Sequence, residues 1–203
     1  MKTAPDFQCG LILLAAGASR RMGRPKQLLP VKGKTLVRYV AERVLRAAVS
    51  PVVVVLGAEE KKIEPSLAGL PVRLAVNPNW SEGMGSSLRV GVESALDFVP
   101  GLHALIIALA DQPGLPPEHL DALIARYRRG GCTLVASQTG AARVPPVLFG
   151  PEWFPRLRQL TGDAGARDIL RENRPDFASV QLADNTDLDT HEDYERYLED
   201  LRC

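Results

Sequence analysis

The strongest indication of the fold is the run Leu11-Ile12-Leu13-Leu14-Ala15-Ala16-Gly17. Its six consecutive apolar residues show no polar alternation, which is typical of a strand covered on both faces in a parallel sheet. The pattern returns at Val52–Leu56, which is followed by Gly57, and at 105–110, which is followed by Asp111. The three runs therefore predict three buried, parallel strands. Further strands are expected at 72–76, 133–137 and 179–182.

Segments with helical periodicity lie between these runs. They follow Thr35, a plausible N-cap, then Ser86-Ser87, then Pro116-Pro117. Their apolar faces are Leu36, Val40, Val44 and Leu45; Leu88, Val92, Ala95 and Leu96; and Leu120, Leu123, Ile124 and Tyr127. A last helix is expected from about Thr190 to the C-terminus. The Pro/Gly-rich stretch 140–151 is expected to be a loop or a small appended element.

This alternation of strands and helices predicts a three-layer α/β/α, Rossmann-like architecture with a mostly parallel central sheet. A chain of 203 residues is long enough for one well-buried core and short for two, so residues 1–203 are expected to form a single domain. In such sheets ligands bind beyond the carboxyl ends of the strands, which directs attention to Gly17, Gly83 and Asp111 and the residues that follow them.

Composition and charge argue against several classes of protein. Lys and Arg total 25 and Asp and Glu total 24, so the net charge of +1 provides no overall field for nucleic acid or an anionic membrane. The apolar runs are too short to span a bilayer and the N-terminus carries no signal-type segment, so a cytoplasmic protein is expected. Cys9, Cys132 and Cys203 lack the spacing of a zinc or redox site and are expected to be reduced thiols, buried or terminal.

A basic loop that contains glycine follows the first apolar run. Arg20, Arg21, Arg24 and Lys26 bring four cations into a short segment that has no acid. Consecutive N–H groups of small residues form an anion-binding nest in such turns, and a bound polyphosphate is the natural counter-charge for the cations. The loop has neither a Walker A motif nor a GxGxxG fingerprint, so a solvated basic turn is the alternative.

Acidic residues at two places complete the candidate site. Asp111 ends a buried strand, where a carboxylate is costly unless a ligand needs it; a simple turn before Pro113 is the alternative. Mg²⁺ bound to a triphosphate is such a ligand, because it takes one or two carboxylates. Asp187, just before the last helix, is our choice for the second metal ligand. Asp189 stays open as that ligand, and Thr190 or Asp189 could instead simply cap the last helix.

The segment 14–26, LAAGASRRMGRPK, resembles the LAAGxSxRMGxxK signature of nucleotidyltransferases related to molybdenum-cofactor and sugar-nucleotide enzymes. In that superfamily the loop wraps the triphosphate. The resemblance implies that Lys26 acts near the α-phosphate, that Arg20 holds the outer phosphates, and that Asp111 is the third catalytic residue. It also supports Asp187 through an acidic motif near the end of the chain.

The resemblance extends to segment 77–88, which looks like the second nucleotide loop of the family, around the base and ribose. Ser86 and Ser87 would there donate to the ligand, with simple capping of the following helix as the alternative. The nucleotide-binding residues implied in both loops are Leu14, Ala15, Ala16, Gly17, Ser19, Arg20, Lys26, Gly83, Gly85, Ser86 and Ser87.

Segment 160–167, LTGDAGAR, together with Asp111-Gln112-Pro113 and Ala15-Ala16-Gly17, resembles the molybdenum-cofactor cytidylyltransferase branch. This implies transfer of CMP from CTP to Mo-molybdopterin, giving the cytosine dinucleotide and pyrophosphate. Mg²⁺, or Mn²⁺ in its place, would be the cofactor, and a recipient molybdoenzyme would be a further partner. The acceptor-binding residues implied are Gln112, Pro146, Gly162, Asp163 and Arg167.

Val144 and Pro145 depart from that branch, which usually has a glycine and a polar residue there, so acceptor preference stays open. The alternatives are a guanylyltransferase acting on the same cofactor, a sugar-phosphate nucleotidyltransferase, and a non-catalytic carrier of the cofactor. Lys26 and the two acids favour an enzyme, because a carrier needs no triphosphate cradle or metal site.

Overall fold

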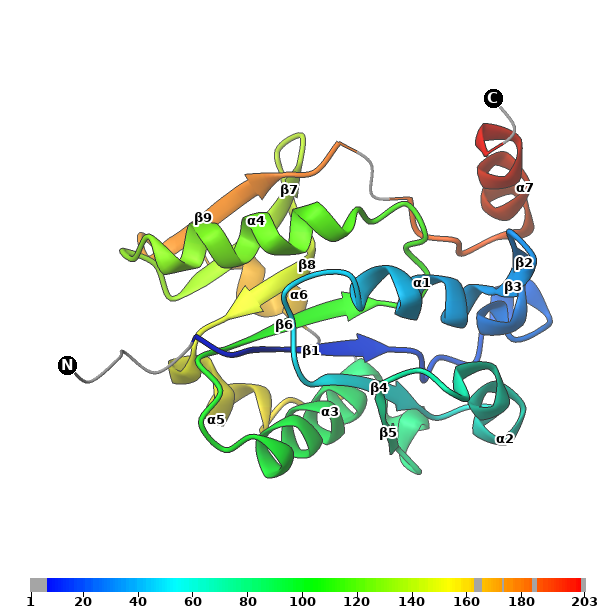
Figure 1. Ribbon diagram of the computed structural model, residues 1–203, viewed down its shortest axis with the longest axis horizontal. Helices are drawn as coiled ribbons and strands as arrows, with labels where there is room; N and C mark the ends of the chain where they lie inside the picture. Colours follow the sequence, from blue (N-terminus) through cyan, green and yellow to red (C-terminus); the bar gives the residue numbers. More distant parts are fainter. Residues whose placement is uncertain (1–6, 163–165, 173, 184–185, 202–203) are drawn as a thin grey trace.

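A computed structural model of the protein describes residues 7–162, 166–172, 174–183 and 186–201. Its centre is a seven-stranded sheet with the strand order β5-β4-β1-β6-β8-β7-β9 (Figure 1). β8 runs antiparallel to both of its neighbours, and the other pairs are parallel, as predicted. The strands are β1 (Cys9–Leu14), β4 (Val52–Leu56), β5 (Arg73–Val76), β6 (Ala104–Leu109), β7 (Leu134–Thr139), β8 (Ala142–Phe149) and β9 (Phe177–Gln181), with a separate hairpin of β2 (Pro30–Val31) and β3 (Lys34–Thr35).

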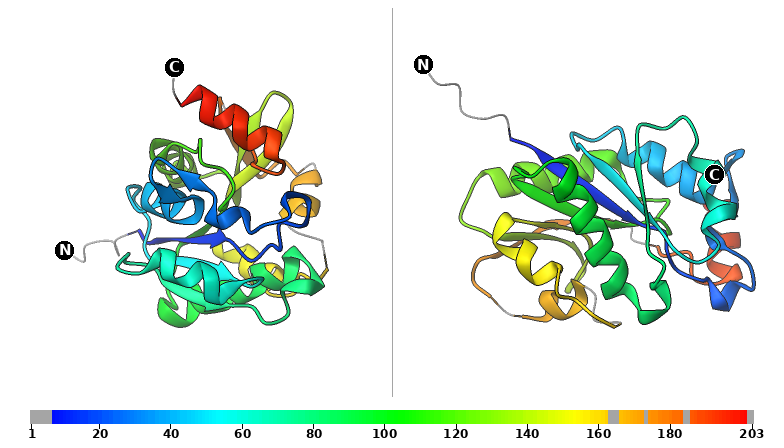
Figure 2. Two further views of the ribbon diagram at one scale, coloured as in Figure 1. Left: turned by 90° about the vertical axis from the view of Figure 1, so that its right-hand side faces the viewer. Right: turned by 90° about the horizontal axis from the view of Figure 1, so that it is seen from below.

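Helices cover both faces of the sheet. They are α1 (Leu36–Val44), α2 (Glu60–Ile63), α3 (Met84–Phe98), α4 (Pro117–Arg128), α5 (Phe154–Leu157), α6 (Ala166–Arg171) and α7 (His191–Asp200), with 3₁₀ turns η1 (Arg20–Met22), η2 (Lys26–Leu28), η3 (Glu64–Leu67), η4 (Trp80–Glu82) and η5 (Pro151–Trp153). One hydrophobic core joins the sheet to α1, α4 and α7, and a second joins it to α3, α5 and α6. The turned views in Figure 2 show the sheet between these layers.

Strand β1 shows why an unbroken apolar run was needed. Leu11 and Leu13 belong to the core on one face, whereas Ile12 and Leu14 belong to the core on the other. A polar residue at any of these positions would face a core, so strict hydrophobicity predicts the covered sheet correctly. The expected three-layer architecture is confirmed.

The stretch 140–151 is mostly a strand, and its prediction as a loop was wrong. β8 pairs with β6 on one side and β7 on the other. The β7–β8 register passes from Ala136 opposite Val147 to Ser137 opposite Val144, so Pro145 and Pro146 lie in a bulge where the ladder needs no N–H donor. The prolines therefore interrupt the ladder locally while the apolar residues 147–149 continue it.

Helix starts differ in how well the sequence predicted them. Thr190 caps α7 with a capping box, in which its Oγ1 accepts from Asp193 N–H at 3.1 Å. Thr35 precedes α1, but its side chain makes no capping bond. α3 begins at Met84, so Ser86 and Ser87 lie in its first turn and do not cap it.

The described residues contain no helix that is long and apolar enough to cross a membrane. Cys9 is buried, as expected, whereas Cys132 is only partly buried, and the two are free thiols among the described residues. Cys203 lies outside the described residues.

Candidate active site

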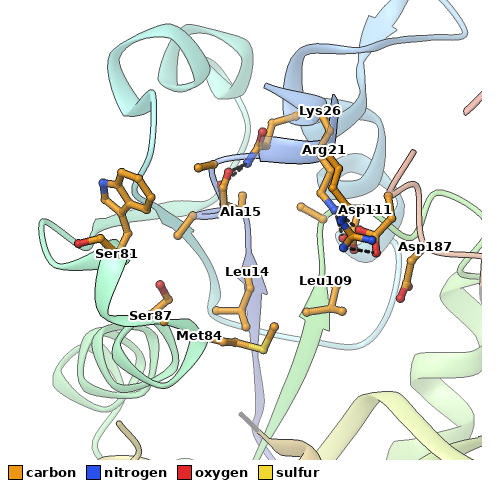
Figure 3. A pocket seen from close by; sticks show the side chains of 18 residues that line it. Leu14, Ala15, Arg21, Lys26, Ser81, Met84, Ser87, Leu109, Asp111 and Asp187 are labelled. Atoms are coloured by element: carbon orange, nitrogen blue, oxygen red, sulfur yellow. Dashed lines mark hydrogen bonds and ion pairs between the residues drawn. The ribbon is translucent and has the colours of Figure 1, made fainter. Parts of the chain in front are cut away.

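A cavity of about 600 Å³ opens at the carboxyl ends of β1 and β6 (Figure 3). This is the edge of the sheet at which ligands bind in open α/β folds. Four segments far apart in the chain form its walls. They contribute residues 14–18 with Arg21, Lys26 and Gln27; Trp80, Ser81, Gly83, Met84 and Ser87; Leu109, Ala110 and Asp111; and Asp187 and Asp189.

The loop after β1 is held in shape by a residue that the sequence analysis missed. Gln27 is 2% exposed, and its Nε2 donates to the carbonyls of Ala15 at 2.9 Å and Gly17 at 2.7 Å. Ser19 adopts a left-handed conformation, with φ of 52°, and its Oγ accepts from Lys26 N–H at 3.0 Å. The Gln27 bonds engage two carbonyls of the loop, and the small residues of the loop line the cavity. A polar residue directly before the apolar pair Leu28-Leu29 was the available signal.

The cations of this loop find acids from other parts of the chain. Lys26 Nζ lies 2.5 Å from Asp111 Oδ2 and 2.9 Å from Asp189 Oδ1, and Arg21 donates to Asp189 Oδ2 at 2.8 Å. Burial alone disfavours the charge on Lys26, but Asp111 and then Asp189 outweigh it, so the pKa of Lys26 is raised. The expected cluster of uncompensated cations is therefore corrected, since two of them are already paired.

Asp187 lies at the same edge of the cavity as Asp111 and Asp189, but its carboxylate has different neighbours. The backbone N–H of buried Leu188 donates to the carbonyl of Asp111 at 3.0 Å, which ties this segment to the end of β6. Asp187 Oδ1 accepts from Gln112 Nε2 at 2.8 Å, and Asp187 forms no ion pair within the part of the chain that the structure describes. Burial, followed by repulsion from Asp111, raises the pKa of Asp187.

Hydrogen bonds and ion pairs thus satisfy the carboxylate of Asp189 more fully than those of Asp111 and Asp187. Asp111 Oδ1 is buried without a hydrogen-bond partner among the described residues. For Asp189, by contrast, Lys26 and Arg21 outweigh the cost of burial, and they lower its pKa. An orphaned carboxylate oxygen beside a carboxylate with a raised pKa suits a divalent cation, and Asp189 suits the role of holding the two basic side chains.

The second predicted nucleotide loop divides into a cavity wall and its support. Gly83 and Ser87 line the cavity, whereas Ser86 is 0% exposed and lies behind it. Gly85 N–H donates to Gly162 O at 2.9 Å, and a Cβ at Gly85 would lie 2.8 Å from the backbone nitrogen of Thr161. Gly85 thus allows the start of α3 to pack closely against the backbone of residues 160–162. Trp80 and Met84 line the cavity and were not predicted.

The expected acceptor residues are dispersed. Gln112 contacts Asp187. Pro146 is buried in the β7–β8 bulge, where its carbonyl accepts from Ser137 Oγ at 2.7 Å, and it does not line the cavity. Gly162 packs on the start of α3 through its carbonyl. Asp163 and the side chains of Arg20 and Arg167 lie outside what the structure describes.

Residues 11–177 match the MobA-like NTP transferase domain. The chain belongs to the MobA-like NTP transferase family. This confirms the nucleotidyltransferase that segment 14–26 predicted. The matched residues include Lys26 and Asp111 and end before Asp187 and Asp189.

Several known proteins are similar to this MobA-like transferase over most of their length. Nicotine blue oxidoreductase of Paenarthrobacter nicotinovorans is 38% identical, with 90% of this chain and 89% of that protein covered. The purine catabolism protein PucB of Bacillus subtilis is 32% identical, with coverages of 91% and 93%. A molybdenum cofactor guanylyltransferase of Rhodobacter capsulatus is 28% identical, with coverages of 81% and 97%.

The fold is also that of a solved mycobacterial protein. The structure of Rv0371C of Mycobacterium tuberculosis in complex with manganese superposes with a TM-score of 0.79 at 25% identity, covering 95% of this chain and 98% of that one. The Rossmann-like nucleotidyltransferase architecture expected from the sequence is therefore confirmed.

Proposed function

We propose that this MobA-like transferase moves CMP from CTP to the phosphate of Mo-molybdopterin, with release of pyrophosphate. The observation that carries the proposal is the meeting of Lys26, Asp111 and Asp187 at one edge of a cavity whose other wall is the small-residue loop after β1. A molybdenum-cofactor acceptor is supported by the guanylyltransferase relative. CTP is supported by the resemblance of segment 160–167 and of Ala15-Ala16-Gly17 to the cytidylyl branch. The product would pass to a recipient molybdoenzyme.

In the proposed reaction an oxygen of the acceptor phosphate attacks the α-phosphorus of the triphosphate. A new P–O bond forms, the bond between the α- and β-phosphates breaks, and pyrophosphate leaves with the electron pair. A phosphate nucleophile is already ionised near neutral pH, so no general base is needed. Catalysis then depends on positioning and on neutralisation of charge.

The side chains of the site have distinct proposed roles. Lys26, kept protonated by its acidic neighbours, would stabilise negative charge on the α-phosphoryl group. Backbone N–H groups of residues 15–18 would bind the triphosphate, with Arg20 at its outer phosphates. Asp189 would keep Lys26 and Arg21 directed at the cavity.

Asp111 and Asp187 would hold Mg²⁺, or Mn²⁺ in its place. The buried, unpartnered Asp111 Oδ1 and the burial of the Asp187 carboxylate, which raises its pKa, fit such an ion. The described residues contain no group of three or more His, Cys, Asp or Glu suited to a metal, and two carboxylates leave positions for water and phosphate oxygens, which Mg²⁺ prefers. When bound, the ion supplies Lewis-acid neutralisation of the phosphate charge.

A second candidate function is an oxidoreductase, because the relative at 38% identity carries that name. The pairing of Lys26 with Asp111 favours the transferase, since hydride transfer does not require a cation at a developing phosphate charge. A reduced nicotinamide dinucleotide would be the natural reductant for the second candidate.

The test measures pyrophosphate released from CTP, GTP, ATP and UTP in turn, with Mg²⁺, and with or without Mo-molybdopterin. Release from CTP only when the acceptor is present is the expected result. Release from GTP would move the proposal to a guanylyltransferase. Tight acceptor binding without any release would favour a carrier. Oxidation of a reduced nicotinamide dinucleotide by a redox dye, again without pyrophosphate release, would favour the oxidoreductase.

A further inference from the structure

A buried amide lies behind the cavity wall that is opposite Lys26. Asn77 directly follows β5, is 1% exposed, and accepts at its Oδ1 from Asn79 N–H at 3.0 Å. A backbone N–H can only donate, so the oxygen of this amide must be the atom that faces Asn79. The orientation of the Asn77 side chain is therefore determined, and its Nδ2 points the other way.

Both protons of that Nδ2 are used by the first turn of α3. Asn77 Nδ2 donates to Ser86 Oγ at 2.8 Å and to Ser87 Oγ at 2.9 Å. Each hydroxyl oxygen therefore accepts a hydrogen bond from Asn77, and its own proton is available to donate to another acceptor. The two serines differ in where that acceptor can be.

Ser86 directs its proton into the protein. Its Oγ donates to Gly83 O at 2.8 Å, with Asn79 O at 3.1 Å as a second acceptor, and the residue is 0% exposed. Both acceptors are backbone carbonyls, which cannot donate in return. The Ser86 hydroxyl is therefore fully satisfied and has nothing left for a ligand.

Ser87 has no such internal acceptor for its proton within the part of the chain that the structure describes. It lines the cavity, and Figure 3 shows its side chain on the wall across from the Lys26–Asp111 pair. A hydroxyl that accepts from behind and has an unused proton presents a donor to whatever fills the cavity. Because the phosphates belong at Lys26 and the loop after β1, the Ser87 wall faces the nucleoside.

We propose that Asn77 is a positioning residue, which holds the Ser87 hydroxyl as a hydrogen-bond donor to an acceptor atom of the bound nucleoside. The inference rests on the proposed function in one respect, namely that the cavity takes a nucleoside triphosphate. It assigns to Asn77 a role in nucleotide binding without any contact to the nucleotide.

The substitution Asn77→Asp reverses this arrangement with little change in shape. A carboxylate has no proton to give, so the Ser87 hydroxyl would turn and donate to it, which leaves lone pairs facing the cavity. The nucleoside would lose a donor and meet an acceptor in its place. Asn77→Ala is the milder change, because it frees the Ser87 hydroxyl to rotate.

The test measures the affinities of the preferred nucleoside triphosphate and of inorganic tripolyphosphate by calorimetry. Ser87→Ala and Asn77→Asp should each weaken the triphosphate about tenfold, the effect of one hydrogen bond, and leave tripolyphosphate unchanged. In the Ser87→Ala background, Asn77→Asp should add little. Ser86→Ala, which removes the neighbouring hydroxyl on the same amide, should cost clearly less than Ser87→Ala. Asn77→Ala should fall between wild type and Asn77→Asp, and it keeps the test open if the aspartate variant does not fold.

Other outcomes would overturn the inference. Wild-type nucleotide affinity in both Asn77 variants, equal weakening of tripolyphosphate, or additive losses in the double variant would each show that Asn77 does not act through Ser87. If wild-type protein binds no nucleoside triphosphate, the proposed function fails and this inference fails with it. If wild type binds one and the variants do not differ from it, only the inference fails.

Discussion

Gly57→Ala tests whether the cavity depends on a close approach of backbone segments. Gly57 directly follows β4, and an added Cβ would lie 2.6 Å from Trp80 Cβ, 2.8 Å from Ala16 Cβ and 2.9 Å from Ala16 O. None of these atoms is the free end of a flexible side chain. Ala58 N–H also donates to Ala16 O at 3.0 Å, so the loop after β1 cannot retreat without straining that bond.

The magnitude follows from two opposing terms. Inserting a methyl group into a well-packed site typically costs about 1–3 kcal/mol. Replacement of glycine by alanine, where the backbone angles allow it, returns about 0.4–1 kcal/mol through the unfolded state. We therefore expect Gly57→Ala to lower the free energy of unfolding by about 1–2 kcal/mol. For a chain of this size each 1 kcal/mol corresponds to a fall in Tm of about 2–4 °C.

Function should respond as well, because Ala16 and Trp80 both line the cavity. Thermal unfolding with and without a nucleoside triphosphate measures both effects, and ligand-induced stabilisation should be smaller in the variant. Gly101→Ala is the matched control, since nothing lies within 4 Å of its added Cβ. The control should stay within about 0.5 kcal/mol of wild type. A Gly57→Ala protein with wild-type Tm and wild-type nucleotide stabilisation would show that the cavity does not depend on this close approach.

Two further predictions concern charge. Lys26→Ala and Asp111→Ala should each lower kcat by about 10²–10³ while circular dichroism shows an intact fold. Near wild-type turnover in Asp111→Ala would contradict the proposed role of Asp111 as a metal ligand. Burial lowers the pKa of His119, whose Nε2 lies 2.7 Å from Ser137 Oγ, so the unfolded chain binds the proton more readily. The free energy of unfolding should therefore fall as pH drops below about 6.5. Urea titrations at several pH values should show a smaller fall in His119→Gln than in wild type, and an equal fall in both proteins would argue against this contribution of His119.

The local parts of the fold and site could be predicted from sequence. Residues 11–16 are apolar throughout because both faces of β1 are covered, and a covered strand leaves that mark whatever its neighbours are. The basic loop and its small residues are likewise contiguous, so this wall of the cavity could be recognised as a motif. The capping box at Thr190 is local for the same reason.

Local composition failed where pairing with distant strands decided the outcome. Prolines 145 and 146 are typical of loops, yet β6 and β7 hold the surrounding residues in a ladder and place the prolines in a bulge. Gln27 is ordinary as a residue type, and its role is apparent only once the carbonyls of Ala15 and Gly17 lie beside it.

The layered α/β architecture, the family and the loop that carries Lys26 could be predicted from the sequence, because the pattern behind each prediction lies in a continuous segment of the chain. Which charged side chains meet depends on the tertiary structure. Lys26 and Asp189 are 163 positions apart in sequence. Their pairing, like the lack of an ion pair at Asp187 among the described residues, follows from how the segment before α7 docks on the end of β6. Electrostatic interactions depend on distance in space and on burial, and neither quantity can be read from positions along a chain.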